Sequence, residues 1–444
     1  MAILIYCCSY YRIYKDFLQL ISFSLDKNED IRYFVYNIRY SRLFWHFPFP
    51  SIVKIWQEGA CCIMSENNKT MGAGKMAAQL GAMIAFLIGS GFASGQEIVQ
   101  YFSGWGSIFS AVMIAVITFI MMYLGFKAYA YAGRSRGLRN INEIFTFYGG
   151  KAFGTILLVI PLGFTACAYF FMCSGFANTL HQQWPAIPIP VGLAVAIIIS
   201  VGSAVLGLNK MVDIIGKIGP VIAIFSLFIG IIAAFSCWPM INEGNMAVNS
   251  GAVEVTRAGA TPLLAGISFG GCCLLLPTAY VGNLSYELRE YKFKYTTIIL
   301  LVECIFYVCA CLLLGLDHMG NIQESATYAI PNLLLASKIF GAASTIMSTT
   351  FAIIILLAIY TTICPLLWST ITLFTKTDKS IAYKITCVIV GIVVYFVCLF
   401  VPYQTLLNYI MTYFGYCGFI VFAVCTVRYF YVKHQDKANG MLVE

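Results

Sequence analysis

Long apolar runs dominate the chain from about residue 76 onward. Clear examples cover residues 108–124, 191–206, 296–314 and 381–401. Their lengths are close to or above the roughly 18 residues that a membrane-spanning helix needs. With their flanking residues, these runs predict ten membrane helices. The expected ranges are 76–103, 107–132, 153–180, 190–207, 213–236, 262–286, 293–315, 335–373, 382–401 and 404–431, with room for a surface or re-entrant helix near 325–345.

The composition supports an all-α integral membrane protein. The chain is 60% hydrophobic and only 10% charged, whereas soluble domains carry about 25% charged residues. The 17 cysteines fall mostly inside the predicted helices and form no CxxC pair or Cys/His cluster. Neither a disulfide framework nor a metal site of that kind is therefore indicated.

Residues 1–70 differ from the remainder of the chain. They are aromatic and basic, contain no spanning run, and lack the ordered regions of a signal peptide. They could form a cytoplasmic arm, a membrane-surface segment, or a stretch that is not translated in the cell. We favour the last, because codons for 57–59 can resemble a ribosome-binding site ahead of Met64 or Met71. We therefore expect an N-terminal extension over 1–70, untranslated or disordered, and a transmembrane domain over 71–444.

Basic residues predict the orientation of the chain. If the first helix starts in the cytoplasm, the only basic residues in the linkers on the opposite side are Arg257 and, at a helix margin, Lys338. Almost every other Lys and Arg after residue 74 then lies on the cytoplasmic side, as the positive-inside rule requires. Both termini are expected in the cytoplasm. The net charge of +8 follows from this topology and needs no nucleic-acid partner.

Two predicted helices carry glycines where they should cross the membrane. The first reads IGSGFASGQE over 88–97, and the sixth reads ISFGGC over 267–272, shortly before Pro277. Each glycine costs a helix about 1 kcal/mol relative to alanine. Unwound backbone is tolerated in a membrane only where protein or a water-filled cavity satisfies it.

The two breaks are five helices apart, which predicts a 5+5 inverted repeat. The two repeats would cover about 76–236 and 262–431. Paired interrupted helices in such repeats are typical of the binding site of a secondary transporter. The alternative is that the glycines only allow neighbouring helices to pack closely.

Short motifs resemble known transporters. The IGSGF stretch at 88–92 resembles the helix 1 signature of amino acid/polyamine/organocation transporters, and 207–220 resembles the helix 4–5 connection of sodium-coupled neurotransmitter-type symporters. The stretch 358–362 resembles their helix 8 sodium segment. Over 74–432 the chain resembles the YkvI-type bacterial membrane proteins of the LeuT-fold superfamily.

This resemblance implies a substrate site and an ion site. Backbone amides at the helix 1 break would bind a substrate carboxylate, helix 6 would line the opposite side, and Tyr169 would close the pocket unless it is ordinary packing. Two threonines of helix 8 would bind sodium with backbone oxygens, or would only hydrogen-bond within their own helix. The implied substrate residues are Gly89, Ser90, Gly91, Tyr169, Ser268, Phe269 and Gly270, and the implied sodium ligands are Ala85, Ile88, Ala358, Thr361 and Thr362.

Charged residues inside predicted helices offer a rival coupling mechanism. An intramembrane carboxylate is costly and indicates function by default. Glu97 and Glu303 could carry a proton, and Lys217 could substitute for a cation. The chain also lacks the arginine that neurotransmitter-type symporters carry in outer helix 1, so their external gate does not transfer.

We therefore expect a LeuT-type secondary transporter in a bacterial inner membrane. The favoured activity is sodium-coupled symport of a small amino acid or related carboxylate by alternating access, with no cofactor besides the ion. Proton coupling or exchange is the alternative within transport, and a solute sensor that does not transport is the alternative outside it. No catalytic His/Cys/Asp constellation is present, so an enzyme is not expected. The sequence leaves the oligomeric state open.

Overall fold

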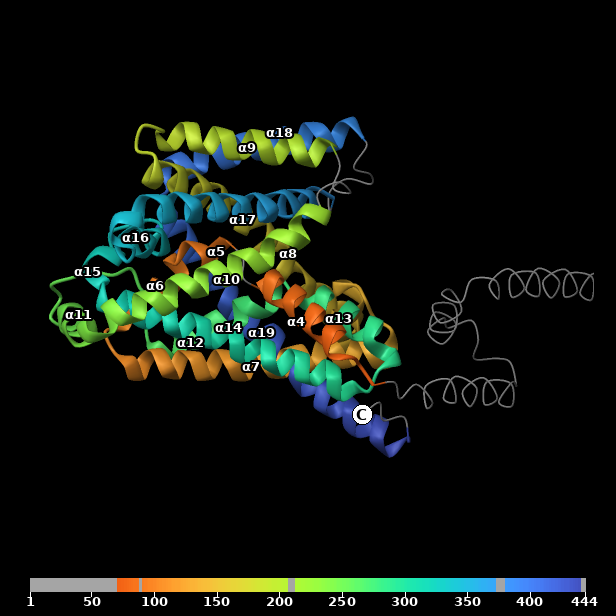
Figure 1. The fold of residues 1–444 in the computed structure, drawn as a ribbon. Helices are drawn as coiled ribbons and strands as arrows, with labels where there is room; N and C mark the ends of the chain where they lie inside the picture. Colours follow the sequence, from red (N-terminus) through yellow and green to blue (C-terminus); the bar gives the residue numbers. More distant parts are fainter. Residues whose placement is uncertain (1–69, 88–89, 207–211, 373–379, 441–444) are drawn as a thin grey trace, which may run out of the picture. The chain divides into compact units, whose positions relative to one another are not determined.

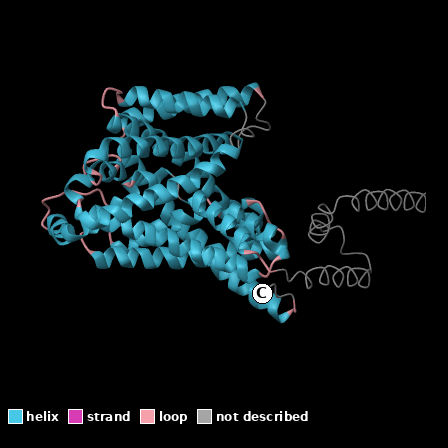
Figure 2. Ribbon diagram, in the orientation of Figure 1, coloured by secondary structure: helices cyan, strands magenta, loops and turns pink. Residues whose placement is uncertain are grey.

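The structure is a computed structural model that describes residues 70–87, 90–206, 212–372 and 380–440. The predicted extension over 1–70 lies almost entirely outside the described residues. The described part is helical and contains no strand (Figure 2).

Each of the ten predicted ranges contains helix, which confirms the all-α class. The first repeat holds α4 (Ala73–Leu87), α5 (Ser90–Ser94), α6 (Gln96–Tyr101), α7 (Ile108–Arg136), α8 (Ile141–Gln183), α9 (Ile189–Leu206) and α10 (Val212–Cys237). The second holds α12 (Pro262–Leu275), α13 (Thr278–Glu287), α14 (Phe293–Gly320), α17 (Ser344–Thr372), α18 (Ile381–Phe400) and α19 (Tyr403–Ala438).

Three short helices lie in the linkers. They are α11 (Ile241–Asn249), α15 (Ile322–Ser325) and α16 (Pro331–Lys338). The predicted eighth helix began at 335, but α17 starts only at Ser344. The residues before it form the separate helix α16, because Gly341 takes a positive φ of 52° that interrupts the helical path.

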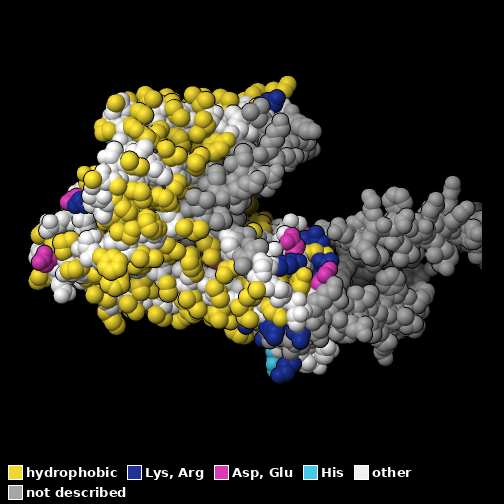
Figure 3. Space-filling model, in the orientation of Figure 1, with side chains coloured by type: hydrophobic (Ala, Val, Ile, Leu, Met, Phe, Trp, Pro, Cys, Tyr) yellow, Lys and Arg dark blue, Asp and Glu magenta, His cyan; other side chains and the backbone are white. Residues whose placement is uncertain are grey.

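The helices fit a multi-pass membrane protein. Among the described residues, seven helices are long and apolar enough to cross a bilayer, the bent pair α12 and α13 makes an eighth, and α9 is a shorter apolar helix. Large apolar side chains point outward, with Phe109 77%, Phe235 82% and Phe400 82% exposed. Figure 3 shows this apolar surface, with Lys and Arg side chains gathered at the end of the bundle where α19 ends. Such a surface matches lipid contact over the length of the helices.

Helix pairing follows a two-fold pattern that relates the two repeats. In the second repeat α19 packs against α12, and in the first repeat the equivalent helix α10 packs against α4. Between the repeats, α7 packs against α12, and the equivalent helix α14 packs against α4. The pairs α8 with α17 and α9 with α18 each join equivalent helices (Figure 1). Exchanging the two halves therefore reproduces the same contacts. This pairing of equivalent helices is the one that the predicted 5+5 inverted repeat requires.

Both helices expected to break are interrupted, but the sixth breaks at a different place. The predicted break at Gly270 and Gly271 is wrong, because both residues lie inside α12. The helix bends by 54° between α12 and α13. Pro277 stands at this bend, where its missing N–H and its ring disrupt the preceding turn.

The glycines of α12 serve close helix packing, the alternative left open above. A methyl group on Gly271 would lie 2.0 Å from the carbonyl oxygen of Gly415 on α19. One on Gly270 would lie 2.9 Å from the sulfur of Met121 on α7. Backbones approach this closely only where a side chain is absent.

Candidate functional site

The first helix changes direction between α5 and α6. Gly95 takes φ +81° and ψ −8°, a left-handed conformation that glycine adopts without steric cost. The carbonyls before it accept hydrogen bonds from side chains. Ser94 Oγ donates to the Gly91 carbonyl at 2.8 Å, and Asn332 Nδ2 donates to the carbonyls of Phe92 and Ala93 at 2.9 and 3.2 Å. The break is thus satisfied inside the protein, as membrane-embedded backbone requires.

Asn332, at the start of α16, is held by a buried histidine. His318 Nε2 lies 2.9 Å from Asn332 Oδ1, and His318 Nδ1 lies 2.9 Å from Ser325 Oγ. Because the amide oxygen only accepts, a neutral His318 carries its proton on Nε2, and Ser325 donates to Nδ1. A methyl group on Gly95 would lie 2.5 Å from Asn332 Oδ1, so this approach also requires glycine. Sequence reasoning missed this group, whose only signals were a lone His and an Asn after Pro331.

Glu97 is the one acidic residue at this break. Its side chain is only 6% exposed. A methyl group on Gly91 would lie 2.5 Å from its Oε2 and 3.0 Å from its Cδ, so the carboxylate rests on Gly91. Within the described part of the chain, no hydrogen bond or ion pair reaches the carboxylate. The sequence named Glu97 and Gly91 separately, and the structure brings them together.

Polar groups from three other helices surround Glu97. Tyr307 and Cys311 of α14, Cys273 of α12 and Tyr403 of α19 lie within electrostatic range of its carboxylate. Tyr403 donates its hydroxyl hydrogen to Ser94 Oγ at 3.0 Å. Elements of both repeats therefore meet around this one side chain.

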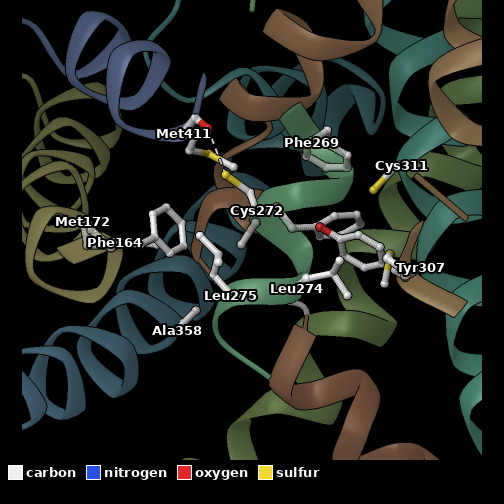
Figure 4. Packing of buried hydrophobic residues seen from close by; sticks show 14 of the residues in the cluster. Phe164, Met172, Phe269, Cys272, Leu274, Leu275, Tyr307, Cys311, Ala358 and Met411 are labelled. Carbon is white, nitrogen blue, oxygen red and sulfur yellow. Dashed lines mark hydrogen bonds between the residues drawn. The ribbon is translucent and has the colours of Figure 1, made fainter. Parts of the chain in front are cut away.

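Aromatic rings form one wall of this region. The ring of Tyr307 lies 6.0 Å from that of Phe92 and 6.3 Å from that of Phe269, centroid to centroid. Phe269 also contacts the rings of Tyr101 and Phe102, at 4.8 and 5.3 Å. Figure 4 shows Phe269 and Tyr307 together, with Cys272 directed to the Met411 carbonyl, 2.9 Å away. Phe269 is the predicted helix 6 residue that joins this wall.

The other predicted substrate residues make contacts within the scaffold. Ser268 Oγ lies 3.1 Å from the Tyr101 hydroxyl and donates to the Thr412 carbonyl at 3.0 Å, joining α12 to α6 and α19. Gly270 faces α7, as described above. The Tyr169 hydroxyl lies 2.6 Å from Ser200 Oγ of α9, so this hydrogen bond joins α8 to α9 and does not reach the helix 1 break.

Part of the predicted sodium site is described. Thr361 and Thr362 donate their hydroxyl hydrogens to the Ala358 carbonyl, at 2.8 and 2.9 Å. This is the hydrogen bonding within one helix that we named as the alternative, and it leaves the lone pairs of both hydroxyl oxygens unused. Helix α17 packs against α5 at the helix 1 break. Ala85 lies in α4 with its side chain undescribed, and Ile88, Gly89 and the side chain of Ser90 lie outside the described residues.

Of the other coupling candidates, Glu303 stands out. It is fully buried in α14, four residues before Tyr307, and neither of its carboxylate oxygens has a hydrogen-bond partner. The side chain of Lys217 in α10 lies outside the described residues. Across the described ranges, no group of three or more His, Cys, Asp or Glu side chains could hold a metal ion.

Comparison with known proteins gives only remote structural likeness. No protein-family model and no curated protein matches the chain. Among solved structures, a variant of the Eremococcus coleocola manganese transporter is 14% identical, with a TM-score of 0.43 over 83% of this chain and 89% of that one. Mhp1, a nucleobase-cation-symport-1 family transporter, is 16% identical, with a TM-score of 0.46 over 81% of this chain and 78% of that one.

Proposed function

We propose that this protein is a secondary active transporter that carries a small amino acid or related carboxylate together with sodium by alternating access. The observation that supports this most is the interrupted first helix, whose break holds a buried carboxylate with no partner among the described residues, between elements of the two repeats. A chain that only anchored or packed in the membrane would gain nothing from such a break. Interrupted helices at a repeat interface are typical of transporter binding sites.

In this proposal the substrate lies between the helix 1 break and the aromatic wall. The backbone of Ser90 and Gly91 would contact its polar end. The rings of Phe269 and Tyr307 would pack against its apolar part. Because α12 and α14 belong to one repeat and α5 and α6 to the other, a relative movement of the repeats would open this place to one side of the membrane at a time.

The proposed sodium site lies across from the break, where α17 meets α5. Its ligands would be the carbonyls of Ala85, Ile88 and Ala358 and the hydroxyls of Thr361 and Thr362. Hard oxygen donors suit a hard cation. Both hydroxyls lie within 2.9 Å of the Ala358 carbonyl oxygen, which supports this proposal.

Uptake into liposomes tests the coupling ion. The variant Thr362→Val keeps the shape of the side chain but removes one oxygen ligand, and a dry site has no water to replace it. We expect the sodium concentration for half-maximal uptake to rise at least tenfold, with substrate affinity falling only through linkage. Thr370→Val is the matched control, since Thr370 also donates within α17, to Leu366 at 2.8 Å, and should leave sodium dependence unchanged.

The same assay separates the alternatives. Uptake that ignores sodium, follows the pH gradient and collapses in Glu97→Gln or Glu303→Gln would replace sodium with protons. Binding without counterflow would indicate a solute sensor.

Gly91 allows a direct test of the substrate position. In Gly91→Ala the new methyl group would displace the Glu97 carboxylate, which is the end of a flexible side chain, so the protein should still fold. We expect solute binding to weaken at least tenfold. Gly202→Ala is the control, since a methyl group there would meet no atom within 4 Å. Unchanged affinity in Gly91→Ala, measured on purified protein, would place the substrate elsewhere.

A further inference from the structure

Resting on the proposed function, the geometry points to a narrower class of solute. We propose that the carboxylate of Glu97 binds a protonated amine of the solute, so that the site accepts amine-bearing solutes and rejects carboxylates that lack an amine. Amino acids remain substrates on this view, whereas the related simple carboxylates do not.

The first reason is that Glu97 is a buried carboxyl group for which the described residues provide no partner. The side chain is 94% buried, from its 6% exposure, and in the described part of the molecule no Lys, Arg or His lies close enough to pair with it. Ionising this group in a buried place is costly without a cation to pair with it. A cation that arrives with the solute and leaves with it would relieve this cost only while the solute is bound.

The second reason is that three backbone acceptors beside the break already accept hydrogen bonds from side chains. The carbonyl of Gly91 accepts from Ser94, and those of Phe92 and Ala93 accept from Asn332. Among the described groups, the Glu97 carboxylate is therefore the acceptor at the break that carries no hydrogen bond and can carry a charge. Hydrogen bonds between ionised partners are the stronger class.

The third reason is that a lone carboxylate is disfavoured in the same place. The Glu97 carboxylate rests on Gly91, whose amide was expected to bind a substrate carboxylate. Two carboxylates there would repel each other. Helix α5 has only five residues, so its dipole offers little to offset that repulsion. A zwitterion avoids the conflict because its ammonium group separates the two anions.

The fourth reason is the aromatic wall beside the carboxylate. Tyr307 lies within electrostatic range of Glu97 and contacts the rings of Phe92 and Phe269. Aromatic faces attract ammonium groups, most strongly where water is excluded. The same rings offer nothing comparable to an anion.

Head-group selectivity of the purified full-length protein tests this inference. The probes are four compounds on one carbon frame at neutral pH, namely alanine, propionate, lactate and alaninamide, together with methylamine, ethanolamine and putrescine. A bound compound raises the unfolding temperature by mass action. We expect alanine, alaninamide or a further amine to stabilise the protein, and propionate and lactate to have no effect.

Variants then assign the selectivity to one side chain. Glu97→Gln keeps the shape without the charge and should weaken amine binding about 100-fold. Asp317→Asn is the matched control, because it neutralises another buried carboxylate, keeps an oxygen that can accept from Trp238, and should change amine affinity less than threefold. If Glu97→Gln does not fold, the comparison of alanine with propionate and lactate on the unaltered protein still decides the question.

Three results would overturn the inference. They are propionate or lactate binding as well as alanine, amine binding that is unchanged in Glu97→Gln, and no amine in the series binding the folded protein. Failure of the proposed function looks different. Amine binding without uptake or counterflow removes transport and leaves this site, whereas uptake of a carboxylate without an amine keeps transport and removes it.

Discussion

Replacing Gly271 with alanine should greatly lower the yield of folded protein. The added methyl group would lie 2.0 Å from the Gly415 carbonyl oxygen and 2.9 Å from the Phe419 nitrogen. These are backbone atoms of α19 that cannot turn aside, so the two helices must separate. We expect destabilisation at or above the upper end of the usual overpacking range of about 1–3 kcal/mol. Yield of monodisperse protein and its thermal inactivation temperature measure this.

The control is a glycine with free space around its Cα. A methyl group added to Gly202 in α9 would have no atom within 4 Å, so Gly202→Ala should behave like the unaltered protein. Gly271→Ala with normal yield and an unchanged inactivation temperature would mean that α12 and α19 do not meet as described.

The second large effect is expected at Asn332. In Asn332→Asp the side chain can still accept from His318 but cannot donate to the carbonyls of Phe92 and Ala93. The Ala93 carbonyl then loses its described partner, at about 1–3 kcal/mol, and the Phe92 carbonyl keeps only the Gly95 N–H at 3.2 Å. A charge is also added beside both carbonyls. We expect transport to fall to background and amide hydrogen exchange in peptides covering 90–101 to increase at least tenfold.

Ser325→Ala is the matched control for that experiment. It removes the other partner of His318, at 2.9 Å, and leaves both donor bonds of Asn332 intact. Transport and exchange in Ser325→Ala should stay close to those of the unaltered protein. Equal losses in the two variants would assign the effect to the histidine and not to the helix 1 break.

The helices could be predicted because the bilayer imposes one simple condition on each of them. A sufficiently long run of apolar residues indicates a membrane helix whatever it packs against, and each of the ten predicted ranges contains helix. The break at Gly270 and Gly271 was misplaced because a glycine pair permits both unwinding and close packing. Which of the two occurs depends on Gly415, which is 144 residues further along the sequence.

The site was only partly predictable for the same reason. Glu97 drew attention as an acidic residue in an apolar helix, which is a local signal. Its contact with Gly91 depends on the left-handed turn at Gly95, and the support from Asn332 depends on how a distant linker folds back. The spacing of residues along the sequence indicates neither of these contacts. The threonines of α17 were chosen by resemblance, and their described hydrogen bonds fit both interpretations that the sequence allowed.

The bend at Pro277 divides the sixth helix into two segments, α12 and α13, that run in different directions. Helix α12 is held to α19 and α7 by close backbone contacts at Gly271 and Gly270, so it offers a fixed support. Beyond the bend, the ten residues of α13 extend about 15 Å. A methyl group on Gly133 of α7 would lie 2.0 Å from the carbonyl oxygen of Gly282 on α13, so α13 is held as closely as α12. A rotation of about 10° at this joint would carry the far end of α13 about 2–3 Å and would have to move α7 with it.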